Sequence, residues 1–291
     1  MRRITLRLSK NIFLVFGLAL FLCLSLSACA PAKPKNPNII LATTTSTQDS
    51  GLLDELIPVF EGESGYVVKI IAVGTGKALT MGREGNADVL LVHAPSAEKD
   101  FMDGGYGEER FLIMHNDFVV VGPASDPAGV NGMSDPLAAM ERIAIAESTW
   151  ISRGDDSGTN KKELAFWEQI GLNPKGEWFL ESGQGMGATL KIASEKDAYT
   201  LTDRATYLFL KENLFSEIVV EGHESLLNVY HTMTVNPEIW EHVNNDGAKA
   251  LANFLISDET QDFIEEYGVD IFGQPLFFPD ADKTDADLGL E

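Results

Sequence analysis

The chain has 291 residues, of which 44% are hydrophobic and 23% are charged, so it has the composition of a globular protein and the length for two domains. Its formal net charge of −22 argues against a nucleic-acid partner and against an anionic membrane surface as a partner. Any anion that this acidic protein binds must therefore be held by hydrogen-bond donors gathered in one place.

The first residues have the pattern of a secretory signal peptide. Basic residues occur up to Lys10, and the apolar run over 12–26 that follows them is too short for an ordinary membrane span. The run ends in Leu26-Ser27-Ala28-Cys29, which resembles a bacterial lipobox. We therefore predict a lipoprotein signal peptide over 1–28 and lipid attachment at Cys29. A plain signal peptidase site beside a bystander cysteine and an uncleaved anchor helix are the alternatives.

The other cysteine, Cys23, lies in the apolar run and leaves with it, so the mature chain has no cysteine pair for a disulfide. Residues 29–37 are proline-rich and lack apolar periodicity, which predicts an extended tether. The exported protein would be held to the membrane through its lipid, facing a periplasm or the cell exterior.

From Asn38 onward, short apolar runs alternate with segments of helical periodicity. The first series predicts strands over 39–42, 67–73 and 89–92, with helices over 51–60 and 76–83. A second series predicts strands over 150–152, 178–180 and 198–200, with helices over 161–170 and 188–193. Alternation of this kind is typical of an α/β fold with parallel strands, and its repetition predicts two similar halves.

Two further apolar runs, 118–123 and 229–235, each lead to a proline and are predicted to be crossings between the halves. Predicted helices over 248–256 and 259–267 would return to complete the first domain. We therefore expect a discontinuous domain I, residues 38–122 plus 229–280, and a domain II, residues 123–228. The acidic residues 281–291 are expected to be a flexible tail.

Polar loops follow several of these strands, where ligands bind in open α/β sheets. Thr44, Thr45 and Ser46 belong to five consecutive hydroxyl residues after the first strand, and such donors with free backbone N–H groups can surround an anion. Capping of the next helix is the alternative interpretation. By its place in the repeat, the loop with Thr75 and Gly76 contributes further candidate contacts.

The loop over 152–159 places a guanidinium, hydroxyl groups and glycines at the start of a helix. Its candidate ligand contacts are Arg153, Ser157, Gly158 and Thr159. The planar fork of Arg153 suits a tetrahedral oxyanion, and charge-assisted hydrogen bonds are about twice as strong as neutral ones, so we favour it over Lys77.

Asp155 and Asp156 lie in the same loop and have the wrong charge for contact with an anion. They either turn away to orient Arg153 and cap the helix, or one of them accepts a hydrogen bond from a protonated ligand. The glycine loop over 183–187 repeats the arrangement of a helix start in the second half, and tight turns alone can explain its glycines.

An enzyme or a metal site would need a different set of residues. The five histidines show no close ligand spacing, and the chain contains no G-x-S-x-G motif. We therefore predict no catalytic residue, no metal and no cofactor.

Taken together, the motifs resemble those of the TupA-type tungstate-binding proteins. They are LATTTSTQDSGL over 41–52, VGTG over 73–76, DVLLVHA over 88–94, NDFVVVGP over 116–123, SRGDDSGT over 152–159, GQGMG over 183–187, YTLTDR over 199–204 and PLFFP over 275–279. The resemblance implies a two-domain periplasmic-binding-protein fold of the class II type, with the ligand cleft between the domains. It also implies an unhydrated oxyanion held by hydrogen bonds, and no enzymatic step.

The resemblance assigns ligand contacts to the threonine loop and to the arginine loop, whereas the assignment of Thr75 and Gly76 rests on the repeat. It implies a monomeric solute-binding component of an ABC importer that delivers tungstate to a permease and its ATPase. A site made of donors suits an unprotonated dianion, and longer metal–oxygen bonds suit a larger cavity than sulfate needs. A molybdate- or sulfate-binding component and an oxyanion sensor outside transport are the alternatives.

Overall fold

The computed structural model describes residues 34–290. The predicted signal peptide, the predicted lipid-attachment residue Cys29 and the first part of the predicted tether lie outside the described residues. Within residues 34–290, no helix has both the length and the apolar character needed to cross a membrane.

The main sheet joins strands that are far apart in the chain. In order of pairing, its strands are β10 (Phe278–Pro279), β4 (Gly107–Pro123), β9 (Leu227–Val235), β3 (Val89–Val92), β1 (Asn38–Thr44) and β2 (Val67–Val73). β1 pairs in parallel with both β2 and β3, which confirms the parallel arrangement predicted for the first series. β9 runs antiparallel to β3 and to β4. Every residue of β3 is buried, which is why this strand reads as an uninterrupted apolar run.

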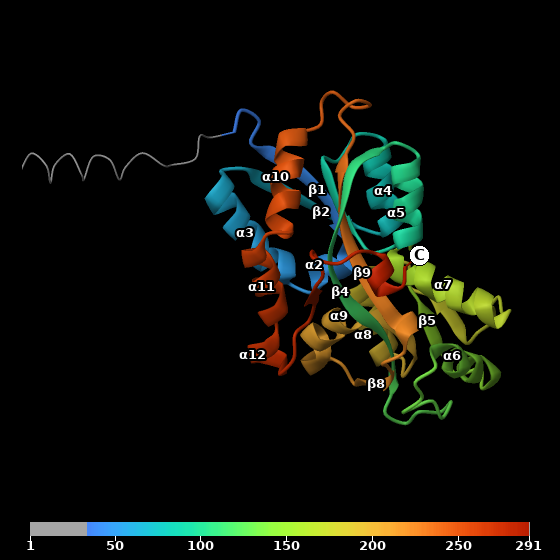
Figure 1. The fold of residues 1–291 in the computed structure, drawn as a ribbon. Helices are drawn as coiled ribbons and strands as arrows, with labels where there is room; N and C mark the ends of the chain where they lie inside the picture. The colour runs from blue at the N-terminus through green and yellow to red at the C-terminus, as the bar shows by residue number, and fades with distance from the viewer. Residues whose placement is uncertain (1–33, 291) are drawn as a thin grey trace, which may run out of the picture.

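We call β1, β2, β3 and β9, with the helices packed around them, the first lobe. Its helices are α2 (Thr45–Asp49), α3 (Leu52–Ser64), α4 (Thr75–Arg83), α5 (Pro95–Asp103), α10 (Asn245–Leu255), α11 (Asp258–Glu266) and α12 (Val269–Phe272). The predicted helices over 51–60, 76–83, 248–256 and 259–267 are confirmed, with small shifts at their ends. The upper part of Figure 1 shows most of this lobe, with α4 and α5 on one side of the strands and α3 and α10 on the other, while α11 and α12 lie lower on the left.

The second lobe repeats the alternation of strand and helix. Its elements are α6 (Pro136–Ile145), β5 (Trp150–Ser152), α7 (Gly158–Ile170), β6 (Phe179–Glu181), α8 (Met186–Glu195), β7 (Thr200–Asp203), α9 (Arg204–Leu210) and β8 (Ser216–Val220). β5 and β6 are parallel. The strand predicted over 198–200 begins later, because Thr200 is the first residue that pairs with β4, whereas Tyr199 makes an isolated bridge to Trp150.

The long strand β4 connects the two lobes and changes its pairing partners along its length (Figure 1). It pairs with β9 as far as Asp117, which lies opposite Leu227, and from Phe118 onward it pairs with β7 and β8. This change falls earlier in the chain than the boundary predicted after Gly122. The residue limits of the two domains remain predictions.

Short side chains and one glycine fix several helix starts. Ser157 caps α7 by accepting the N–H of Asn160, and Asp203 caps α9 by accepting the N–H of Thr206. Gly51 precedes α3 with a left-handed φ of 79°, and a Cβ there would lie 2.8 Å from the hydroxyl oxygen of Tyr267. Another residue at this position would combine backbone strain with a steric clash.

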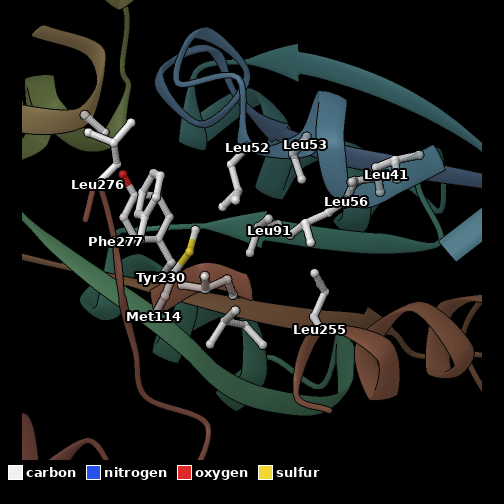
Figure 2. Packing of buried hydrophobic residues seen from close by; sticks show 14 of the residues in the cluster. Leu41, Leu52, Leu53, Leu56, Leu91, Met114, Tyr230, Leu255, Leu276 and Phe277 are labelled. Carbon is white, nitrogen blue, oxygen red and sulfur yellow. The ribbon is translucent and has the colours of Figure 1, made fainter. Parts of the chain in front are cut away.

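The largest hydrophobic cluster lies between the strands of the sheet and the helices that cover them. Figure 2 shows Leu52 and Leu56 of α3 meeting Leu91 of β3 and Leu255 of α10, all of which are buried. Burial of each leucine side chain stabilises the fold by about 1.5–3 kcal/mol relative to exposure. The cluster continues into α8 and α9 of the second lobe, so apolar packing holds the ends of these helices against the first lobe.

Residues 281–290, for which the sequence predicts a flexible tail, make several contacts with the rest of the fold. Asp280, which precedes them, is fully buried, and its carboxylate accepts hydrogen bonds from His115 Nδ1 at 2.6 Å and from Lys283 Nζ at 2.7 Å. A turn of 3-10 helix over Ala286–Leu288 follows. The tail ends beside α5 and α7, where the C-terminal mark lies in Figure 1.

Asp285 holds this segment against β4 and β9. Its carboxylate accepts hydrogen bonds from Arg110 Nη1 at 2.7 Å and from His231 Nε2 at 2.9 Å. Partial burial raises the pKa of Asp285, but the bonds from Arg110 and His231 outweigh that effect and hold it below its ordinary value. The acidic composition of this segment predicts that its carboxylates face solvent. In the fold, however, Asp280 is paired with Lys283 and Asp285 with Arg110.

Candidate functional site

Four loops at helix starts meet where the two lobes touch. In Figure 1, α2 lies at this junction, between the strands of the first lobe and helices α8 and α9 of the second. The side chain of Arg153 crosses the junction, since its Nη2 donates to Thr45 Oγ1 at 2.9 Å. The backbone N–H of Gly76 also crosses it, to the carbonyl oxygen of Asp156 at 3.1 Å. The structure therefore brings the predicted threonine and arginine loops into contact.

The threonine loop both caps a helix and faces the second lobe. Thr44 is the N-cap of α2, accepting the N–H of Thr47, so the capping interpretation is correct for this residue. Ser46 is 1% exposed, and its Oγ lies 3.0 Å from Thr44 Oγ1. Thr45, in contrast, directs its hydroxyl group to Arg153. A single loop thus supplies a cap and a group at the junction.

Arg153 is the buried cation of the site, with 1% of its surface exposed. Its Nη2 donates to Asp155 Oδ2 at 2.6 Å, and its Nη1 lies 3.5 Å from Thr159 Oγ1. The other oxygen of Asp155 accepts the N–H of Ser157 at 3.2 Å. Asp155 therefore orients the guanidinium, as one of our two interpretations predicted. Lys77, the alternative cation, is exposed.

Within the four loops, two buried donors have no hydrogen-bond partner among residues 34–290. They are Arg153 Nε and Thr75 Oγ1, one from each lobe. A buried polar group without a partner costs about 1–3 kcal/mol, and more if the group is charged. Donors without partners, one of them on a cationic group, are the groups that an anion would satisfy, so the observation points to an anion as ligand.

Two predicted glycine contacts have structural roles as well. The N–H of Gly76 is donated to Asp156, so it is already in use in this arrangement. A Cβ at Gly158 would lie 2.8 Å from His93 Cε1, so glycine at this position lets α7 approach the first lobe closely. Ser157 is the N-cap of α7. Which of these groups also touch the ligand remains a prediction.

His93 is a residue of the site that sequence reasoning missed, because the histidines were judged only by their spacing from one another. It directly follows β3, at the same sheet edge as the threonine loop, and that position was the available signal. Its Nδ1 lies 2.8 Å from Asn228 Oδ1 and its Nε2 lies 3.2 Å from Ser46 Oγ. Burial lowers the pKa of His93 to about 4, so the imidazole is neutral near pH 7.

The hydrogen-bond network assigns the tautomer of His93. Asn228 donates its amide hydrogens to Asn116 Oδ1 at 2.7 Å and to Tyr230 Oη at 2.9 Å, so its Oδ1 is the acceptor that faces His93. His93 Nδ1 therefore carries the proton, and Nε2 accepts from the hydroxyl group of Ser46. His93 fixes Ser46 and contributes no positive charge to the site.

Glu163 on α7 binds the strand that precedes the arginine loop. Its Oε1 accepts the indole N–H groups of Trp150 at 2.9 Å and Trp167 at 3.0 Å, and its Oε2 accepts from Ser152 Oγ at 2.8 Å. Burial raises the pKa of Glu163 to about 7 despite these bonds. The glutamate joins α7 to the end of β5, the strand that leads directly to Arg153.

The described part of the chain contains no group of three or more His, Cys, Asp or Glu residues placed to hold a metal ion. What the loops bring together are hydroxyl groups, a guanidinium and helix starts. These groups can replace the water molecules around an anion and hold it through hydrogen bonds.

Comparison with known proteins agrees with this geometry. Residues 31–259 match the family model described as PBP superfamily domain. The chain is 45% identical to the tungstate-binding protein TupA of Peptoclostridium acidaminophilum, over 94% of this chain and 100% of that protein.

Two solved structures are similar as well. The tungstate ABC transporter structure from Geobacter sulfurreducens matches with a TM-score of 0.72 and 44% identity, over 79% of this chain and 98% of that one. The tungstate-binding protein TupA from Desulfovibrio alaskensis G20 matches with a TM-score of 0.70 and 44% identity, over 84% of this chain and 99% of that one. Both confirm the predicted fold class.

Replacing Glu163 with Gln tests the raised pKa. Between pH 4.5 and about 7, the folded protein keeps a proton on Glu163 that the unfolded chain has released, so stability falls as the pH rises through this range. A glutamine cannot titrate. From pH 4.5 to 7, the wild-type protein should lose on the order of 3 kcal/mol of unfolding free energy relative to Glu163→Gln.

Urea denaturation at a series of pH values measures this difference. Glu168→Gln is the matched control, because Glu168 lies on the same helix and is exposed. A stability difference between wild type and Glu163→Gln that does not change with pH would contradict the assignment.

Proposed function

This chain belongs to the PBP superfamily and, within it, to the family of TupA tungstate-binding proteins, and from that premise we propose that it is the extracytoplasmic solute-binding component of an ABC importer. Its ligand is tungstate, which it delivers to a permease with its ATPase. The protein acts as a monomer and performs no chemical step on the ligand. No cofactor is needed for this function.

The observation that carries the proposal is the pair of unpartnered donors, Arg153 Nε and Thr75 Oγ1, buried where the lobes meet. Thr45 and Thr159 add hydroxyl groups beside the same guanidinium. A dianion that reaches this junction gains a charged hydrogen bond and contacts from both lobes, so it favours the closed arrangement. Closure then reports to the importer that the ligand is bound.

The carboxylate of Asp155 supports an unprotonated ligand. One of its oxygens is bound to Arg153 and the other accepts the N–H of Ser157, so both are committed within the loop. Hydrogen phosphate carries a proton and would need an acceptor for it, whereas tungstate and molybdate carry no proton near neutral pH. The site therefore favours the unprotonated dianions, and the larger oxyanions fill a wider closed cavity than sulfate does.

Calorimetric titration of the mature chain from Ala30 with tungstate, molybdate, sulfate and phosphate tests the ligand. We expect tungstate to bind, and Arg153→Ala to weaken binding roughly ten- to a hundredfold, because the variant loses a charged hydrogen bond worth about 1.5–3 kcal/mol. Lys77→Ala removes an exposed cation next to Gly76 and is expected to leave binding unchanged.

The unfolding transition of each variant must first show that it is folded. Binding of molybdate or sulfate in preference to tungstate would assign the protein to a related importer. Binding of phosphate alone would contradict the argument from Asp155, and the absence of binding of all four anions would contradict the proposal.

We also propose that the protein is exported and held to the membrane by a lipid on Cys29, facing the periplasm or the cell exterior. The support is the lipobox-like sequence that ends the apolar run. Cys29→Ala should release the protein from the membrane fraction and abolish labelling by a radioactive fatty acid, whereas Cys23→Ala should do neither. A Cys29→Ala protein that stays membrane-bound and labelled would contradict lipid attachment at this residue.

A further inference from the structure

A carboxylate of the first lobe lies at the start of a helix of the second lobe. Asp49 is the last residue of α2, and its Oδ2 accepts the backbone N–H of Gly187 in the first turn of α8 at a distance of 3.0 Å. Helix starts favour negative charge because their N–H groups and the helix dipole point outward. Asp49 therefore makes a charge-assisted contact between the lobes in addition to the Arg153 contact.

A second contact between the lobes mirrors the first. Gly76 lies in the first turn of α4 in the first lobe and donates its N–H to the carbonyl oxygen of Asp156 in the arginine loop. In each half, the second polar loop therefore contacts the opposite half, through Gly76 in the first lobe and through Gly187 in the second. The structure thus assigns a closing role to the helix starts of α4 and α8.

Glycines make both contacts possible. A Cβ at Gly187 would lie 3.2 Å from Asp49 Oδ2 and 3.1 Å from Leu210 Cδ1, which is tighter than ordinary van der Waals contact. A Cβ at Gly74 would lie 2.8 Å from the carbonyl oxygen of Asp155. Side chains at these positions would push the lobes apart, so the glycines permit this close approach.

The charges around Asp49 act in two directions. Burial raises the pKa of Asp49, while the bond from Gly187 and the positive charges of Arg153 and Lys191 lower it. The carboxylate thus favours closure through Gly187. It also places a negative charge near a site meant for a dianion, and this charge alone would weaken anion binding. If closure through Gly187 is the dominant role of Asp49, neutralising its charge weakens anion binding. If repulsion of the anion is the dominant role, neutralising the charge strengthens binding.

We propose that Asp49 is a latch between the lobes, a positioning residue that stabilises closure through the Gly187 N–H and so slows release of the bound anion. The proposal rests on the proposed function only in its choice of tungstate as the probe. Because the contact joins groups on different lobes, a separation of the lobes at this point would break it. Its loss lowers the closed population and with it the apparent affinity.

The test is Asp49→Asn, which keeps the size of the side chain and removes its charge. We expect the Kd for tungstate, measured by calorimetry, to rise roughly three- to thirtyfold. The matched control is Asp54→Asn. Asp54 lines the same groove of about 550 Å³, but it is exposed and its hydrogen bond goes to Gln48 within the first lobe. Its substitution should leave the Kd unchanged.

A readout of lobe separation distinguishes a latch from a general loss of structure. By small-angle scattering, anion-free Asp49→Asn should have a larger radius of gyration than the wild type, and saturating tungstate should bring the two values together. Hydrogen exchange at the Gly187 amide should be faster in the variant. Gly187→Ala perturbs the same contact from the other lobe without changing any charge, so it should shift affinity and scattering in the same direction.

Tighter tungstate binding by Asp49→Asn would overturn the proposal, because repulsion of the anion would then be the dominant role of Asp49. An unchanged Kd with unchanged scattering would also overturn it. If the wild-type protein binds none of the four oxyanions, the proposed function fails. The latch then stands or falls on the scattering and exchange of the anion-free proteins.

Discussion

The arrangement of the two lobes depends on the compensation of one buried charge. Arg153 is almost completely removed from water, and an ionised group buried in this way is tolerated only when other groups satisfy it. Asp155 and Thr45 satisfy one end of the guanidinium, and Nε is left without a partner among residues 34–290. The first lobe therefore supplies part of what the charge in the second lobe requires. In the function that we propose, a dianion supplies the rest and so couples binding to closure.

The remainder of the fold places donors around that charge. Parallel strands β1, β2 and β3 end at one edge of the sheet, and β5 and β6 repeat the arrangement in the second lobe. Each strand leads into a helix start, where N–H groups and small side chains are available. The starts of α2, α4 and α7 carry the candidate ligand contacts, and the starts of α4 and α8 also bind the opposite lobe through Gly76 and Gly187. The overall negative charge of the protein does not prevent anion binding because the donors are concentrated at this junction.

Much of this could be predicted from the sequence because the signals are local. Strands buried on both faces, such as β3, read as apolar runs, and the threonine and arginine loops are continuous segments at strand ends. What could not be predicted depends on contacts between distant residues. The tautomer of His93 depends on Asn228, 135 residues away, and the contact of Asp49 is made with Gly187, 138 residues away. The contacts of the acidic tail could not be predicted for the same reason, since the partners of Asp285 lie on β4 and β9.

Binding of the anion between the lobes against Arg153 is tested most directly by a crystal structure of the protein grown with tungstate and recorded at a tungsten absorption edge. We expect one strong anomalous peak at the junction, with tungstate oxygens within hydrogen-bonding distance of Arg153 Nε and Thr75 Oγ1. A peak elsewhere, such as in the groove lined by Lys161 and Lys162, with both of those donors still unpartnered, would contradict it.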